Sequence, residues 1–301
     1  MSSELTRRVL FGVVAAPIAI GIVLVGGAPL AALLAIVSAI GAWELFRIAR
    51  ATGLTPLDNL GIALAGILPL LVHARYLRLY EPNTSISPLT LAALVVLALL
   101  AIAIWARGVA GRPLAAVATT VFGIAYTGGM LSYGYAIRYH DYAFGGATIG
   151  GWSVPTGGVL LLLPMLLTWA SDIGAYAVGR TMGRHKLIPR VSPGKTVEGA
   201  IGGVVVTVLV CWAYVRFALV PHAQLALGPL DTLIFAIVIS VAAQVGDLAE
   251  SLIKREAGVK DSSHIIPGHG GVLDRFDSLL FVLPVAYLLL GVKLIPAPGS
   301  R

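Results

Sequence analysis

Long apolar runs dominate this chain and restrict it to very few kinds of fold. Nine stretches of close to 20 mostly apolar residues follow one another with short connections. About 20 apolar residues is the length that an α-helix needs to cross a bilayer. Only 12% of the residues are charged, whereas a soluble domain carries roughly 25%. We therefore predict an all-α, polytopic integral membrane protein with about nine transmembrane helices. The expected spans are residues 9–27, 29–47, 58–75, 88–106, 114–137, 157–180, 199–220, 229–253 and 271–293.

The first span has two interpretations. It follows Arg7 and Arg8, which is also the arrangement of a secretory signal peptide. However, it runs through "GGAPLAALL" directly into a second apolar run. We therefore interpret these two runs as a retained helical hairpin.

Basic residues predict the orientation in the membrane, because cytoplasmic loops are enriched in Lys and Arg. With nine spans, the connections on one face hold 13 of the 21 basic residues, and they include the 180–195 and 254–275 connections. We place this face in the cytoplasm and the protein in the cytoplasmic (inner) membrane. The net charge of +7 suits membrane lipid and anionic substrates. No basic patch interleaved with aromatic residues predicts binding to nucleic acid.

Acidic residues are concentrated in the second half of the chain. Only five of the 14 acidic residues precede position 171, and several of the others fall inside apolar runs. An ionised side chain at the bilayer centre costs about 2.5–3.5 kcal/mol, so it normally faces a cavity, a partner or a ligand. We predict a transmembrane scaffold over residues 1–150 and a transmembrane catalytic region over residues 151–301.

The first polar segment contains Asp172, which ends a long apolar stretch and precedes a run of basic residues. A buried structural ion pair is one interpretation of this pattern. A site carboxylate is the interpretation we favour. Arg180, Arg184 and Lys186 follow within a few turns, and their positive charges would otherwise lie together without a neutralising negative charge.

The second segment is "SPGKTVEGAIGG", residues 192–203. Its "GKT" suggests a phosphate-binding P-loop, but that motif needs a glycine where Pro189 stands and a preceding strand, which we do not expect here. We instead expect Ser192 or Thr196 to cap a helix that begins near Val197. A helix N-terminus next to Lys195 would attract a phosphate, and a plain capping loop is the alternative.

The third segment, residues 247–278, is the densest in charge. Four polar residues recur at the spacing of one helical face: Asp247, Glu250, Ser251 and Lys254. After a glycine-rich loop, a second helix presents Asp274, Asp277 and Ser278. Mg²⁺ uses one or two carboxylates together with water and substrate phosphates, so this pattern predicts a magnesium–phosphate site. A network of structural ion pairs is the alternative, and His264 and His269 lack the accompanying ligands of a zinc site.

Residues 251–277, "SLIKREAGVKDSSHIIPGHGGVLDRFD", resemble the signature of the phosphatidate cytidylyltransferases, also called CDP-diacylglycerol synthases. "SDIGAYAVGR" and "SPGKTVEGAIGG" resemble the segments that precede this signature in the family. The resemblance covers residues 170–290. It implies that the cytidylyl group of CTP is transferred to phosphatidic acid, which gives CDP-diacylglycerol and pyrophosphate for phospholipid synthesis.

The resemblance also implies roles for individual residues. Asp247 and Asp274 would bind Mg²⁺, with a second metal ion and a homodimer left open. The expected catalytic residues are Asp172, Lys195, Asp247, Lys254, Arg255, Lys260, Asp261, Asp274, Arg275 and Asp277. The expected substrate-binding residues are Ser192, Thr196, Glu198, His264, His269, Gly270 and Gly271.

Two other functions fit some of these features. A lipid-alcohol kinase of related membrane type would use similar metals and basic residues. A secondary transporter would also carry carboxylates inside the membrane, but it normally shows corresponding interruptions in two repeated halves. The one-sided distribution of polar residues here argues against a transporter.

Overall fold

The computed structural model describes residues 3–77, 87–140, 146–149, 152–266, 268 and 270–297. In this part of the chain, eight helical segments are long and apolar enough to cross a membrane, and they match the second to ninth expected spans. The first expected span falls in α1 (Ser3–Val25), whose residues Val13–Val25 form a shorter apolar helix. The prediction of an all-α polytopic membrane protein is confirmed.

Ten α-helices and two π-helices make up most of the described chain. After α1, the helices are α2 (Gly27–Ala51), α3 (Asp58–Tyr76), α4 (Pro88–Ala106), α5 (Pro113–Gly123), η1 (Ile124–Gly129), α6 (Met130–Arg138), α7 (Thr156–Met182), α8 (Val197–Tyr214), η2 (Val215–Ala223), α9 (Pro229–Glu256) and α10 (Leu273–Lys293). Six short strands form three antiparallel pairs: β1 (Gly146–Ile149) with β2 (Trp152–Pro155), β3 (Lys186–Ile188) with β4 (Ser192–Thr196), and β5 (Leu225–Ala226) with β6 (Ile295–Pro296).

The chain forms two compact units that interleave along the sequence. Unit 1 contains Met1–Leu30, Tyr133–Leu252 and Arg275–Arg301, and unit 2 contains Ala31–Ser132 and Ile253–Asp274. The predicted division into a scaffold (residues 1–150) and a catalytic region (residues 151–301) concerns function, and it stays a prediction.

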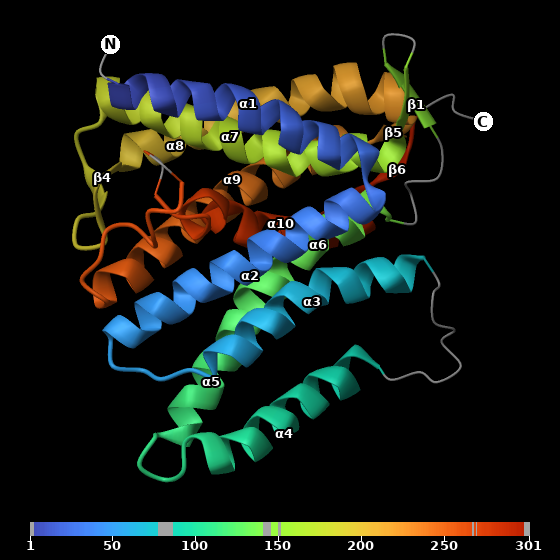
Figure 1. Ribbon diagram of the computed structural model, residues 1–301. Helices are drawn as coiled ribbons and strands as arrows, with labels where there is room; N and C mark the ends of the chain where they lie inside the picture. The colour runs from blue at the N-terminus through green and yellow to red at the C-terminus, as the bar shows by residue number, and fades with distance from the viewer. Residues whose placement is uncertain are drawn as a thin grey trace. The chain divides into compact units, whose positions relative to one another are not determined.

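In unit 1, α7 and α8 lie side by side (Figure 1). Glycines allow this close approach, as is common between helices in a membrane. A Cβ atom on Gly202 would lie 2.5 Å from Val178, and one on Gly174 would lie 2.9 Å from the carbonyl oxygen of Gly202.

Polar contacts attach α9 to these two helices. The hydroxyl groups of Ser171 on α7 and Ser240 on α9 are 2.8 Å apart, and the side-chain amide of Gln244 donates to the carbonyl oxygen of Ala200 at 3.1 Å. Hydrogen bonds of this kind between membrane helices contribute about 0.6 kcal/mol each on average. They fix the parts of α7 and α9 that carry Asp172 and Asp247.

The segment before α8 corrects one expectation from the sequence. A strand, β3, does precede "GKT", and β4 contains the motif itself. The two strands form an antiparallel hairpin with an irregular register. The strand, turn and helix of a P-loop are therefore not formed, and position 189 still lacks the glycine. A strand of three residues is too short to be recognised from alternating hydrophobicity.

In unit 2, Phe46 of α2 forms the centre of a small core. Its ring is fully buried and lies against Gly61 of α3 and Gly123 of α5, where any larger residue would collide with it. Nearby, the hydroxyl of Thr120 accepts a hydrogen bond of 2.8 Å from the backbone amide of Leu57. These contacts join α2, α3 and α5.

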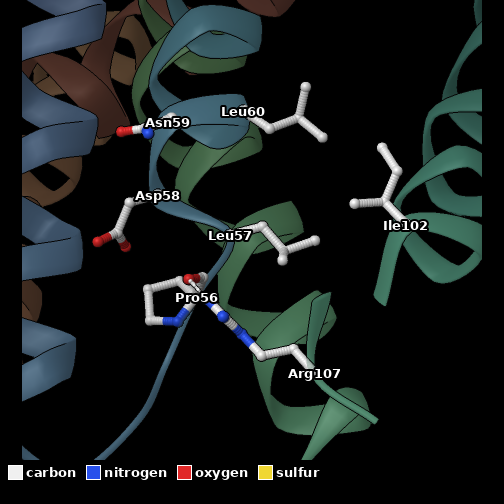
Figure 2. Close-up of a pocket in the computed structure, with 7 residues that line it drawn as sticks. All are labelled: Pro56, Leu57, Asp58, Asn59, Leu60, Ile102 and Arg107. Atoms are coloured by element: carbon white, nitrogen blue, oxygen red, sulfur yellow. Dashed lines mark hydrogen bonds between the residues drawn. The ribbon is translucent and has the colours of Figure 1, made fainter. Parts of the chain in front are cut away.

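A cavity of about 350 Å³ lies near the start of α3 in unit 2. Figure 2 shows Leu57 and Leu60 on one side and Ile102 of α4 on the other. Arg107 closes one end of the cavity, and its guanidinium donates to the carbonyl oxygens of Thr55 and Pro56. The lining includes none of the residues expected at the active site.

Candidate active site

In unit 1, the structure gathers four of the expected catalytic residues. The ammonium nitrogen of Lys195, on β4, lies 2.7 Å from a carboxylate oxygen of Asp247 on α9. The carboxylate of Asp172, on α7, interacts electrostatically with Asp247, Lys195 and Arg275. We call these four residues the Asp247 cluster. Asp172 and Arg275 are exposed, and Lys195 and Asp247 are half-buried, so a ligand can reach the charges.

Asp247 and Ser251, two of the residues expected on one helical face of α9, contact each other. The hydroxyl of Ser251, one turn later, donates to the Asp247 carboxylate at 3.4 Å. Next to Asp247, α9 packs closely on α10. This packing depends on Gly246, where a Cβ atom would lie 2.7 Å from the carbonyl oxygen of Asp277. The Asp277 carboxylate itself accepts from the backbone amide of Ser278 at 2.6 Å.

The Asp247 cluster suits a hard divalent cation that is also bound by phosphates. Asp172 and Asp247 supply carboxylate oxygens, and Mg²⁺ typically takes one or two carboxylates while water and substrate phosphates complete its shell. Among the described residues, no three His, Cys, Asp or Glu side chains gather closely enough to bind a metal by themselves. The donor set thus fits Mg²⁺ bound together with a nucleotide.

Two expected substrate-binding residues, Thr196 at the end of β4 and Glu198 at the start of α8, have structural partners. Thr196 accepts from the amide of Gly199 at 3.1 Å and caps α8, which begins at Val197 as predicted. Glu198 accepts from the amide of Arg184 at 3.0 Å and contacts the ring of His185 at 2.5 Å. Both contacts hold the hairpin that carries Lys195. Ser192 is half-buried at the start of β4.

In unit 2, Asp274 is the centre of a second cluster. One of its carboxylate oxygens lies 2.5 Å from the ammonium nitrogen of Lys254, and this pair is almost completely buried. The other oxygen accepts from the amide and the hydroxyl of Ser262, both at 2.9 Å, and from the amide of Gly271 at 2.8 Å. Asp274 therefore connects the end of α9, the loop after it and the start of α10.

The glycines of this loop are required by its geometry. Gly270 has φ +82°, a conformation that residues with a Cβ atom rarely adopt. A side chain on Gly271 would collide with the hydroxyl of Ser262 and the carboxylate of Glu44. Asp261 lies close to Gly270.

The remaining expected residues of unit 2 lie at its surface. Arg255, Lys260 and His264 are exposed, and the Arg255 guanidinium donates to the carbonyl oxygen of Val259 at 3.3 Å. His269 lies outside the described residues. The prediction that Asp247 and Asp274 bind one metal ion joins residues of two units, and it stays a prediction.

Glu44 also belongs to the cluster around Asp274, and the sequence pattern did not predict it. This residue is fully buried in α2, and its carboxylate accepts from the amides of Val272 and Leu273 at 2.9 and 2.6 Å. The hydroxyls of Ser262 and Ser263 donate to it as well. The one available signal was a single carboxylate inside an apolar run, which pointed to no particular partner.

Comparison with known proteins agrees with the resemblance of the signature segment. A family model described as the cytidylyltransferase family matches residues 6–292. The phosphatidate cytidylyltransferase of Bacillus subtilis (strain 168) is 34% identical over 289 residues, which cover 96% of this chain and 98% of that protein. Phosphatidate cytidylyltransferases of Staphylococcus saprophyticus and Staphylococcus haemolyticus are each 48% identical over 130 residues, or 43% of this chain and 48% of theirs. The chain belongs to the cytidylyltransferase family.

Proposed function

We propose that this protein transfers the cytidylyl group of CTP to phosphatidic acid and so makes CDP-diacylglycerol and pyrophosphate. The observation that carries this proposal is the Asp247 cluster, in which two carboxylates, a lysine and an arginine gather on membrane helices and a hairpin. Such a mixture of charges suits a reaction between two polyanions. Family membership and the relatives named above support the same reaction.

The reaction needs alignment and charge neutralisation more than it needs a nucleophilic side chain. A phosphate oxygen of phosphatidic acid attacks the α-phosphorus of CTP. The bond from this phosphorus to the oxygen that bridges to the β-phosphate breaks, and pyrophosphate leaves with the electron pair. Lys195 and Arg275 are placed to neutralise phosphate charge, which stabilises such a transition state.

Magnesium is the cofactor that we propose, with Asp247 as a ligand and Asp172 as a supporting carboxylate of the Asp247 cluster. The expected roles of Asp274 as a ligand and of Asp277 as a supporting carboxylate stay predictions. When bound, the ion would neutralise phosphate oxygens and orient the nucleotide. We further propose that Lys195, Arg255, Lys260 and Arg275 bind phosphates, and that His264, Gly270 and Gly271 lie along the nucleotide. Lys254, also expected to bind phosphate, is almost completely buried against Asp274. The Asp274 carboxylate contacts Lys254 and the backbone amide of Ser262. We therefore expect Asp274 to hold the loop in place.

Isotope labelling tests the reaction directly. Purified protein given phosphatidic acid, Mg²⁺ and CTP labelled at the α-phosphate is expected to move the label into the lipid phase. With CTP labelled at the γ-phosphate, the label is expected in pyrophosphate alone, since the bond breaks between the α- and β-phosphates.

The same assay separates the alternatives. Lipid labelled from the γ position would indicate a lipid kinase. An absence of lipid-dependent turnover with either nucleotide would favour a transporter. Protein heated until it unfolds is the control for transfer that does not depend on the enzyme.

We also propose that the catalytic residues face the cytoplasm, where CTP is found. Single cysteines at Arg184 and Glu256, both exposed positions, are expected to resist an impermeant thiol reagent in intact cells and to react after permeabilisation. The buried Cys211 is first replaced by Ala. Labelling of either cysteine in intact cells would reverse the proposed orientation.

A further inference from the structure

Glu44 lies far in sequence from the loop that it contacts. It belongs to α2, and its carboxylate accepts hydrogen bonds from residues 262, 263, 272 and 273. These four residues stand at the two ends of one loop segment. A single side chain therefore holds both ends of the segment together, within unit 2.

The donors explain how a carboxylate is tolerated at a fully buried position. Burial of a charge is costly unless hydrogen bonds replace its water. Val272 and Leu273 offer backbone amides at the start of α10, where the first amides of a helix have no partner inside the helix. The positive end of the helix dipole also favours an anion there. The two serine hydroxyls complete the set.

Glu44 is connected to the expected catalytic residues through Ser262. The Ser262 hydroxyl lies 3.2 Å from Glu44 and 2.9 Å from Asp274, which in turn binds Lys254. Gly271 leaves no space between these groups, since a Cβ atom there would collide with Ser262 and Glu44. A shift of Glu44 would therefore move the loop and the surroundings of Asp274 together.

We propose that Glu44 is a positioning residue for cytidylyl transfer. It closes the loop that carries His264, Gly270 and Gly271, and it acts on the substrates through that loop without touching them. This proposal rests on the proposed function above, but the closure of the loop can be measured without any activity.

Two substitutions test the proposal. Glu44→Gln keeps the length of the side chain but leaves one acceptor oxygen for four donors. Glu44→Asp keeps the charge but is one methylene shorter and cannot reach both ends of the segment. We expect kcat and kcat/KM to fall together by roughly 100-fold in both variants, because misplacement of catalytic groups by about 1 Å has an effect of this size.

Hydrogen exchange supplies the readout that does not depend on turnover. In the unmodified protein, the amides of Val272 and Leu273 are expected to exchange slowly, and in both variants at least about ten-fold faster, since they lose a buried acceptor. Ser38→Ala is the matched control, because Ser38 is also fully buried in α2 and its hydroxyl has no partner among the described residues. It is expected to change neither exchange nor kcat.

The outcomes separate the two proposals. Normal exchange and normal kcat in folded Glu44→Gln protein would overturn the positioning role, and so would full rescue by Glu44→Asp. If the unmodified protein fails to transfer label from CTP, the proposed function fails, while the exchange rates still decide whether Glu44 closes the loop. If Glu44→Gln does not fold, Ser263→Ala, which removes one donor, is expected to show the same changes to a smaller extent.

Discussion

Replacing Asp247 by Asn is expected to lower kcat by about 1,000-fold, with the protein still folded and inserted in the membrane. The substitution keeps the shape of the side chain and removes the charge that binds Lys195 at 2.7 Å and lies near Asp172. Loss of one electrostatic group from a transition-state site commonly lowers kcat by 10²–10³-fold, and loss of a metal ligand adds to this. Initial rates of CDP-diacylglycerol formation measure the effect.

Asp231→Asn is the matched control for this experiment. Asp231 stands on the same helix, α9, and forms an ion pair of 3.0 Å with Lys293. Both side chains of that pair are partly exposed, so its loss has little effect on stability. We expect its kcat to stay within about two-fold of the unmodified value.

A magnesium titration tests whether Asp247 acts as a ligand. EDTA is expected to abolish activity and Mg²⁺ to restore it. The residual activity of Asp247→Asn should need a higher Mg²⁺ concentration, because loss of a ligand lowers the affinity for the metal. The Mg²⁺ requirement of Asp231→Asn should stay unchanged, since Asp231 lies in the first turn of α9, 16 positions before Asp247. Near-normal activity of Asp247→Asn at ordinary Mg²⁺ concentrations would falsify the proposed role.

Much of the fold could be predicted because apolar length is a local property of the sequence. The span expected at 58–75 is the helix Asp58–Tyr76, and the span expected at 229–253 is Pro229–Glu256. The start of α8 could also be predicted, since a threonine cap and the helix that it begins are neighbours in sequence.

The parts that could not be predicted depend on contacts between distant residues. Glu44 and Leu273 are separated by 229 positions, and nothing in the neighbourhood of Glu44 indicates that its carboxylate meets the start of α10. The strand β3 was missed for a different reason: its few residues pair with β4 across a tight connection, and so short a strand has no periodic pattern.

The members of the candidate site were expected from the sequence, and their roles stay predictions; their contacts could not be predicted. The pairing of Lys195 with Asp247 joins two of the polar segments, residues 192–203 and residues 247–278. Thr196 and Glu198 were expected to bind substrate, and the structure gives both of them partners within the protein. Residue types near one another in sequence indicate the chemistry, whereas the packing of α7, α8 and α9 decides which residues meet.

Breaking the buried pair of Lys254 and Asp274 is expected to reduce both stability and activity. Their side chains are only 11% and 6% exposed, and removal of one partner from a buried pair typically costs about 3–5 kcal/mol. We expect Lys254→Met and Asp274→Asn to lower the thermal unfolding temperature in detergent and to lower kcat by at least about 100-fold, because Asp274 also holds Ser262 and Gly271.

Exchanging the two residues is the decisive form of this experiment. If the pair acted only by charge attraction, the double variant Lys254→Asp with Asp274→Lys would recover most of the stability. We expect no recovery, because the amides of Ser262 and Gly271 need an acceptor at position 274 and a lysine offers only donors. The double variant Lys254→Met with Asp274→Asn should instead be more stable than Lys254→Met alone, since it leaves no buried carboxylate without its cation. Recovery in the exchanged protein would show that Asp274 acts through its charge and not by organising the loop.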